Sequence, residues 1–264
     1  ASDYDSPDGR VDHTGFHSDS LLARYSHRLG RDASVWLNLQ RHADHDVWYP
    51  GSARTGGQPG GAGIPPPLGT VTIHSPEQRR ELIELGVDAR LGPGRLEASV
   101  NRQEVFRQIR AWSERLGRDY GRNDVSFVTD GLQPRSLPPL GQRHLLTMGL
   151  QASRMTGDPE RYIDNNAPAF DNNARNDPFD HGVLRSTGLY LQDEFRLGPV
   201  RLLAGLRNDR VTGDARSKGA GPAAVTEGLR HRDDTLSWSL GAIWSLAPGL
   251  DPYVNLSRGV RAAD

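Results

Sequence analysis

Two histidines and two aromatic residues lie close together in the first part of the sequence. His42 and His45 are followed by Trp48 and Tyr49. Histidine nitrogens ligate iron and aromatic rings stack on flat ligands, so this group is a candidate site for an iron chelate or a heme-like ligand. The same residues would also suit the end of a strand, where histidines meet water and aromatic side chains lie at an interface. Both interpretations stay open at this point.

Carboxylates and amides gather in a second segment, between residues 164 and 180. Asp171, Asp177 and Asp180 offer the oxygen ligands that Ca²⁺ prefers. Their order matches no EF-hand loop, however, and aspartate and asparagine are also the usual residues of turns. We therefore predict no metal site and no cofactor, and name these three only as the candidates for a bound cation. Together with His181, Asp177 and Asp180 could also supply the acid and base of a hydrolase.

A third set of candidates consists of arginines on the polar side of an alternating pattern: Arg90, Arg95, Arg207 and Arg261. A guanidinium group binds carboxylates and other oxyanions through paired hydrogen bonds. These arginines would pair with neighbouring carboxylates, namely Asp88, Glu97 and Asp209, or attract an anionic ferric chelate. Arg207 and Arg261 are the two that we predict to contact such a ligand.

The composition limits which kind of protein can hold these groups. The 264 residues carry a net charge of -1, which gives no overall basic field for nucleic acid. Cysteine is absent, which excludes disulfides and thiolate zinc sites, and no run of about 18 apolar residues predicts a transmembrane helix. A mean hydropathy of -0.63, with 30 glycines and 18 prolines, argues for a polar β-rich protein and against a helical bundle.

Alternating polarity predicts ten strands in five hairpins, at 21–29 with 34–42, 82–91 with 95–101, 124–132 with 143–153, 189–197 with 200–209, and 236–246 with 253–258. Short polar turns join the two strands of each hairpin. Long connections, at 43–78, 103–122, 156–184 and 213–232, join one hairpin to the next. Short turns at one rim and long loops at the other are typical of an antiparallel, up-and-down transmembrane β-barrel of an outer membrane.

The two faces of the predicted strands differ as a membrane barrel requires. Ile83, Leu85 and Val87 form an aliphatic face, while Glu84 and Asp88 lie opposite. In a barrel, lipid would contact the aliphatic face and a hydrated lumen the charged one. A soluble β-sandwich also alternates in this way, but its apolar face would pack against a second sheet.

Five short motifs follow one another in the second half of the chain: HLLTMG at 144–149, GLYLQDE at 188–194, LAGLRND at 203–209, LSWSLG at 236–241 and YVNLSRGVRA at 253–262. Their order and spacing resemble those of the TonB-dependent outer-membrane receptors across residues 143–264. Residues 1–142 share the hairpin rhythm of that family. In that family the last of these hairpins typically ends in the sequence GFRAP. Here Val260 replaces the phenylalanine and Ala263 the proline, and this weakens the case for a heme receptor.

The resemblance implies an all-β barrel of about 22 strands, of which residues 1–264 would form an internal portion with ten strands. The plug domain, the energy-coupling box and the C-terminal strands of the family would lie outside this chain. The resemblance further implies uptake of iron–siderophore or related iron complexes across the outer membrane of a Gram-negative bacterium, energised by the TonB complex through the plug. Such a protein has outer-membrane lipid as a partner and is not an enzyme.

Two other functions stay open from the sequence. A passive outer-membrane porin would show the same alternation but would have no plug. A ten-stranded outer-membrane hydrolase would place acid and base groups at its outer rim, where Asp177, Asp180 and His181 are expected. As ten strands cut from a larger barrel, by contrast, the chain would have two unpaired edges, at 21–29 and 253–258, and would aggregate in water when isolated.

Overall fold

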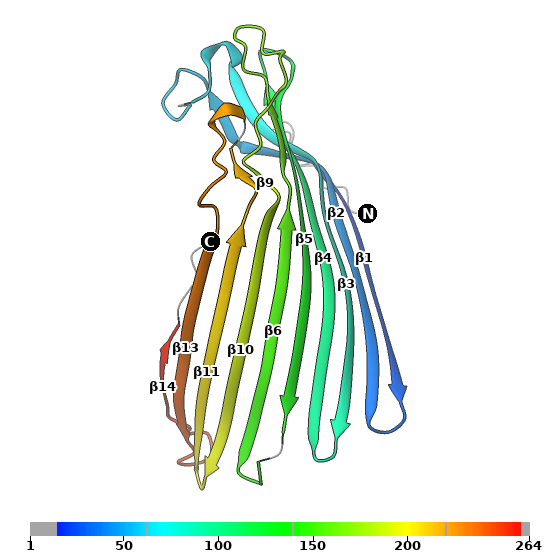
Figure 1. Ribbon diagram of the computed structural model, residues 1–264, viewed down its shortest axis with the longest axis vertical. Helices are drawn as coiled ribbons and strands as arrows, with labels where there is room; N and C mark the ends of the chain where they lie inside the picture. The colour runs from blue at the N-terminus through cyan, green and yellow to red at the C-terminus, as the bar shows by residue number, and fades with distance from the viewer. Residues whose placement is uncertain (1–14, 62, 139, 220, 260–264) are drawn as a thin grey trace.

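The computed structural model describes residues 15–61, 63–138, 140–219 and 221–259. Ten long strands form one antiparallel sheet, in which each pairs with the next long strand along the chain (Figure 1). Their bounds are β1 His17–Leu29, β2 Ala33–Thr55, β3 Thr70–Leu91, β4 Gly94–Ser113, β5 Arg118–Leu137, β6 His144–Gly157, β10 Gly182–Leu197, β11 Val200–Asp214, β13 His231–Trp244 and β14 Tyr253–Arg258. The predicted ten strands and their up-and-down order are confirmed.

Six short elements lie in the connections at one end of the sheet. They are the 3-10 helices η1 Pro66–Leu68 and η2 Gly221–Ala223 and the strands β7 Glu160–Ile163, β8 Ala174–Arg175, β9 Phe179–Asp180 and β12 Ser217–Lys218. β7 pairs with β5 and β8, and β9 pairs with β12, so these connections are ordered against one another. Among the described residues, no helix is long and apolar enough to cross a membrane.

The connections at the two ends of the sheet differ in length. At the lower end in Figure 1, turns of two to eight residues close the hairpins, at 30–32, 92–93, 138–143, 198–199 and 245–252. At the opposite end, the connections at 56–69, 158–181 and 215–230 are long. The asymmetry expected from the sequence is therefore present.

Two of the predicted loops are largely strand. Residues 43–55 and 70–78 extend β2 and β3, and the expected loop at 103–122 consists of the ends of β4 and β5, joined by residues 114–117. The loop prediction was wrong because it followed apolar alternation, which reports a face turned away from water. In these extensions both faces carry polar residues, while the backbone hydrogen bonds between the strands continue.

The sheet has a single layer and almost no packed core. The buried hydrophobic residues of the described chain are Ala43, Leu68, Val71 and Phe170. Large aliphatic side chains are instead bare along the sheet, as in Leu189, which is 59% exposed, and Leu240, which is 56% exposed. A soluble sandwich is excluded, because its apolar face would lie against a second sheet. An aliphatic face of this extent requires lipid or detergent against it.

The curvature of the sheet separates the two sets of side chains. Arg24, Asp88, Arg135 and Tyr190, from four different strands, line one recess and therefore share the concave face. Consecutive strand residues point in opposite directions, so the neighbours of these residues in sequence, such as Leu189, lie on the convex face. The concave face is polar and the convex face is aliphatic along most of the sheet.

Two glycines let aromatic rings lie across the neighbouring strand on the concave face. The register places Gly86 opposite Trp36 and Gly149 opposite Tyr190. A Cβ atom at Gly86 would lie 2.3 Å from the Trp36 ring, and one at Gly149 would lie 2.5 Å from the Tyr190 hydroxyl oxygen. The absence of a side chain at each glycine thus fixes where the aromatic ring rests.

Candidate ligand-binding face

Ion pairs hold three strands together on the concave face. Arg95 donates to Asp88 Oδ1 over 2.9 Å and lies 3.2 Å from Glu97, and Arg135 donates to Glu97 over 2.6 Å. These four side chains, from β3, β4 and β5, border a recess of about 530 Å³ that also includes Trp36. The predicted pairing of Arg95 with Asp88 and Glu97 is confirmed.

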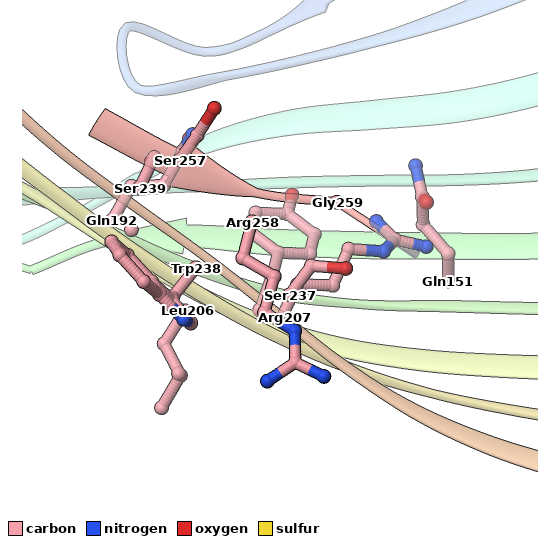
Figure 2. Close-up of a pocket in the computed structure, with 12 residues that line it drawn as sticks. Gln151, Gln192, Leu206, Arg207, Ser237, Trp238, Ser239, Ser257, Arg258 and Gly259 are labelled. Carbon is pink, nitrogen blue, oxygen red and sulfur yellow. The ribbon is translucent and has the colours of Figure 1, made fainter. Parts of the chain in front are cut away.

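A second recess, of about 450 Å³, lies further along the concave face and is lined from β6, β10, β11, β13 and β14 (Figure 2). Gln151 and Gln192 contribute amide groups to it. Arg207 donates from Nε and Nη2 to Asp209, over 2.7 Å in each case, as the sequence predicts. The Arg207 guanidinium carbon also lies 6.0 Å from the centre of the Tyr190 ring. Since 37% of the Arg207 side chain is exposed, it can still donate to an oxyanion in the recess.

The two histidines of the first candidate group lie within β2, and three positions apart in a strand puts them on opposite faces. His42 Nε2 lies 3.2 Å from Asp44 Oδ1. His45 lies 3.7 Å from Asp19 and 6.1 Å, ring to ring, from His17. The structure therefore does not bring His42 and His45 together, and the loop position predicted for His45, Trp48 and Tyr49 within 43–78 is corrected to a strand.

The two aromatic residues of that group also contact different neighbours. Trp48 stacks on His74 with 4.4 Å between ring centres. The Tyr49 hydroxyl accepts hydrogen bonds from Gln78 Nε2 over 2.6 Å and from Arg107 Nη2 over 2.9 Å. By strand alternation Gln78 and Arg107 lie on the concave face, which places the Tyr49 hydroxyl there as well. Arg261 lies outside the described residues.

The three carboxylates named as cation candidates do not converge. Asp171 accepts a hydrogen bond from the Asn166 amide group, and Asp177 accepts one from the Arg161 backbone N–H over 2.8 Å. Asp180 instead lies near Asp158 and His181, with one ligand atom of each within 4.8 Å of the others.

The Asp180 carboxylate already has partners in its loop. The hydrogen bond from His181, at 2.6 Å, is the largest influence holding the pKa of Asp180 below its ordinary value, and the charge of Arg216 adds to it. Arg216 Nη1 donates to the same carboxylate over 3.1 Å. These contacts make Asp180 a link between the two connections at 158–181 and 215–230.

A small apolar cluster in the loops has no counterpart in the sequence predictions. Phe170 packs with Leu68 and Val71, and Tyr120 lies against the group. Burial raises the pKa of Tyr120. Arg118 Nη1 donates to Asp164 over 2.7 Å, and this contact fastens the connection that carries Phe170 to the start of β5. The connections at 56–69 and 158–181 thereby form one ordered cap at this end of the sheet.

A single-layer antiparallel sheet with an aliphatic convex face and a charged concave face defines a segment of a transmembrane β-barrel. The family model for the TonB-dependent receptor-like β-barrel matches residues 1–264, and the chain belongs to this family. A search of curated protein sequences gives no match.

Solved structures of low sequence identity share the fold. The FrpB iron transporter from Neisseria meningitidis (F3-3 variant) is 16% identical, with a TM-score of 0.67, and the match covers 93% of this chain and 38% of that one. The copper transporter OprC is 12% identical, with a TM-score of 0.68 over 93% and 36% of the two chains. The alcaligin outer-membrane receptor FauA from Bordetella pertussis is 13% identical, with a TM-score of 0.63 over 91% and 35%. The chain thus spans little more than a third of each.

The family assignment decides between the functions left open by the sequence. Its members are transporters of the Gram-negative outer membrane and are not enzymes, so the predicted location is confirmed. The hydrolase that would have used Asp177, Asp180 and His181 is therefore excluded. The passive porin is also set aside, because the match is to the barrel of a TonB-dependent receptor.

Proposed function

We propose that the full-length protein imports iron–siderophore or related iron complexes across the outer membrane. In this proposal the ten strands belong to a barrel of about 22 strands, and a plug domain elsewhere in the protein receives energy from the TonB complex. The fold is shared with FrpB, an iron transporter, with FauA, an alcaligin receptor, and with FecA, a ferric citrate transporter, which supports the same class of cargo.

The observation that carries the proposal is the set of half-exposed arginines on the concave face. The side chains of Arg95, Arg135 and Arg207 are 51%, 52% and 37% exposed, although each pairs with a carboxylate. Each guanidinium therefore keeps N–H groups that can donate to a further oxyanion. Ferric complexes with citrate, catecholate or similar oxygen ligands carry negative charge, and their oxygen atoms can accept charge-assisted hydrogen bonds from these N–H groups.

Among the candidate ligand residues, Arg207 has the most complete surroundings. It combines a fixed guanidinium with an aromatic ring and two amides in one recess. His42 and Tyr49 also lie on the concave side, closer to the long connections through which a ligand would enter. Arg261 follows β14 in the sequence and stays a candidate for the same face.

Binding of defined iron chelates to the full-length protein in detergent tests the proposal. We expect ferric citrate to bind, and Arg207→Gln to weaken it by about tenfold or more, because a hydrogen bond to a charged group contributes about 1.5–3 kcal/mol. Arg41→Gln is the matched control, since Arg41 lies on the convex face and pairs with Glu81 at 3.5 Å. Equal affinity in Arg207→Gln and the native protein would contradict the role of Arg207. Failure of every ferric chelate to bind, with Cu²⁺ bound instead, would contradict the cargo.

A further inference from the structure

A row of charged residues crosses the convex face just beyond its aliphatic part. The register of six neighbouring strands, from β4 to β13, aligns Arg102, Asp130, Arg154, Arg185, Thr212 and Arg232. All six lie on the same face as Leu189, because strand residues an even number of positions apart point the same way. Four of the six residues in this row are arginines.

The aliphatic belt begins two rows below. There the register aligns Leu150, Leu189, Asn208 and Leu236, and Leu189 and Leu236 are 59% and 52% exposed. Arg185 and Leu189 are four residues apart in β10, a distance of about 13 Å along the strand. In a barrel of this family the belt contacts lipid chains, so the row of arginines lies at the depth of the lipid headgroups. Because the row is on the side of the long connections, these are headgroups of the outer leaflet.

Two of the arginines differ from the others in their partners. Arg102 pairs with Asp130 at 3.0 Å, and Arg232 pairs with Asp234 at 2.7 Å. Arg154 and Arg185 stand directly opposite each other on β6 and β10, and both are exposed. Neither has a hydrogen-bond or ion-pair partner within the described ranges of the chain.

Like charges in directly opposed positions of a sheet are destabilising, since their Cβ atoms lie only about 4.5–5.5 Å apart. The acidic residues on either side do not relieve the repulsion, because Asp130 is paired with Arg102 and Asp234 with Arg232 and Arg210. Asp130 stands opposite Arg154 in the register, but in the part of the chain that the structure describes no carboxylate forms an ion pair with Arg154 or Arg185, so the two positive charges keep no partner of their own there.

We propose that Arg154 and Arg185 together bind the phosphate of an anionic lipid headgroup in the outer leaflet. Planar guanidinium groups bind phosphate oxygens through two parallel hydrogen bonds, and two of them match the charge of about -1.5 to -2 on a phosphate monoester. The position at the edge of the aliphatic belt favours a lipid over a free anion, because acyl chains attached to the phosphate would lie along Leu150 and Leu189.

Native mass spectrometry of the full-length protein in a neutral detergent tests this site. The probe is short-chain phosphatidic acid, compared with phosphatidylcholine of the same chain length and with inorganic phosphate. We expect one phosphatidic acid to bind more tightly than either comparison compound. The variant Arg154→Gln/Arg185→Gln should weaken that binding by about tenfold or more, because it removes two charge-assisted contacts. Arg41→Gln, a convex-face arginine paired with Glu81, should bind as the native protein does.

Each outcome bears on the proposal. Unchanged binding in the double variant would overturn it, and so would equal affinity for phosphatidylcholine. Tighter binding of inorganic phosphate than of phosphatidic acid would show an anion site without a lipid. If the double variant does not assemble, as judged by its heat-dependent mobility on gels, the single variants Arg154→Gln and Arg185→Gln replace it, and each should weaken binding. The ferric citrate affinity should stay unchanged in all of them, since the site is on the opposite face of the sheet.

Discussion

Removing the Phe170 side chain should open the cap formed by the loops while leaving the barrel strands intact. Phe170 is 2% exposed and packs with Leu68 and Val71, so that it joins the connection at 158–181 to the one at 56–69. Replacing a buried phenylalanine with alanine costs about 3–5 kcal/mol. Phe170 has a φ of +49°, and alanine at that φ has a similar backbone penalty, so the change mainly reports the lost packing.

The expected change in local opening follows from that free energy. A loss of about 3–5 kcal/mol raises the population of the open cap by two to three and a half orders of magnitude, since about 1.4 kcal/mol corresponds to a factor of ten. The backbone N–H of Asp164 donates to the Tyr120 carbonyl over 2.9 Å, so its hydrogen exchange should accelerate by a comparable factor. The peptide at 200–214, within β11, should exchange as in the native protein.

Hydrogen exchange with mass spectrometry on the full-length protein, reconstituted in lipid, measures both peptides. Leu140→Ala is the control, because Leu140 lies in a short turn at the opposite end and is 50% exposed. The reasoning would be refuted if exchange at Asp164 in Phe170→Ala rose by less than about threefold, which is the size of effect expected for an exposed side chain. Acceleration in β11 of the same size would show that the cap and the barrel unfold together.

Three further predictions follow from the same contacts. Gly149→Ala should lower the free energy of unfolding by about 1–3 kcal/mol, measured by urea denaturation in detergent, because its Cβ would lie 2.5 Å from the Tyr190 hydroxyl. Combining it with Tyr190→Ala, which removes that hydroxyl, should eliminate most of the loss caused by the clash. The contact between β9 and β12 should persist at neutral pH and weaken as the pH falls below about 3.8, the ordinary pKa of aspartate. The reason is that the hydrogen bond from His181 lowers the pKa of Asp180, so this carboxylate stabilises the contact only while it is ionised. Asp180→Asn should abolish the pH dependence in hydrogen-exchange measurements on residues 215–219. The isolated chain should aggregate in water and disperse in detergent, because β1 and β14 each pair on one side only and the convex face is bare; a monodisperse, cooperatively melting chain in plain buffer would disprove this.

The strands could be predicted where one face carries aliphatic residues. Ile83, Leu85 and Val87 identify β3, because the convex face needs apolar side chains at every second position. The same rule fails for residues 103–113, where β4 continues without an aliphatic face. There the strand is specified by pairing with its neighbours, which apolar periodicity does not report.

The arginine–carboxylate pairs could also be predicted, because they follow from spacing. Arg207 and Asp209 are two residues apart in a strand and must share a face. The same reasoning argues against one site for His42 and His45, which are three apart, once the segment is known to be a strand. The prediction grouped them because it ended the strand at His42 and placed His45 in a loop, where spacing does not restrict the direction of a side chain.

The cap and the phosphate site could not be predicted from the sequence. Phe170 reaches Leu68 across about 100 residues of chain, and no local pattern signals such a contact. Arg154 and Arg185 become neighbours only through the register of β6 and β10. A slip of one residue in that register would turn one side chain to the other face.

The assignment of the two faces is the claim on which the ligand and lipid proposals both rest. Cysteine is absent from residues 1–264, and with any cysteine elsewhere in the full-length protein replaced, spin labels can be placed at single cysteines introduced at Leu189, Tyr190, Leu191 and Gln192 in lipid. Electron paramagnetic resonance then measures how often each label collides with oxygen, which dissolves in lipid, and with a water-soluble nickel chelate. We predict that oxygen reaches positions 189 and 191 and the nickel chelate reaches 190 and 192. Equal access of the nickel chelate to all four positions, or the reverse alternation, would contradict the account.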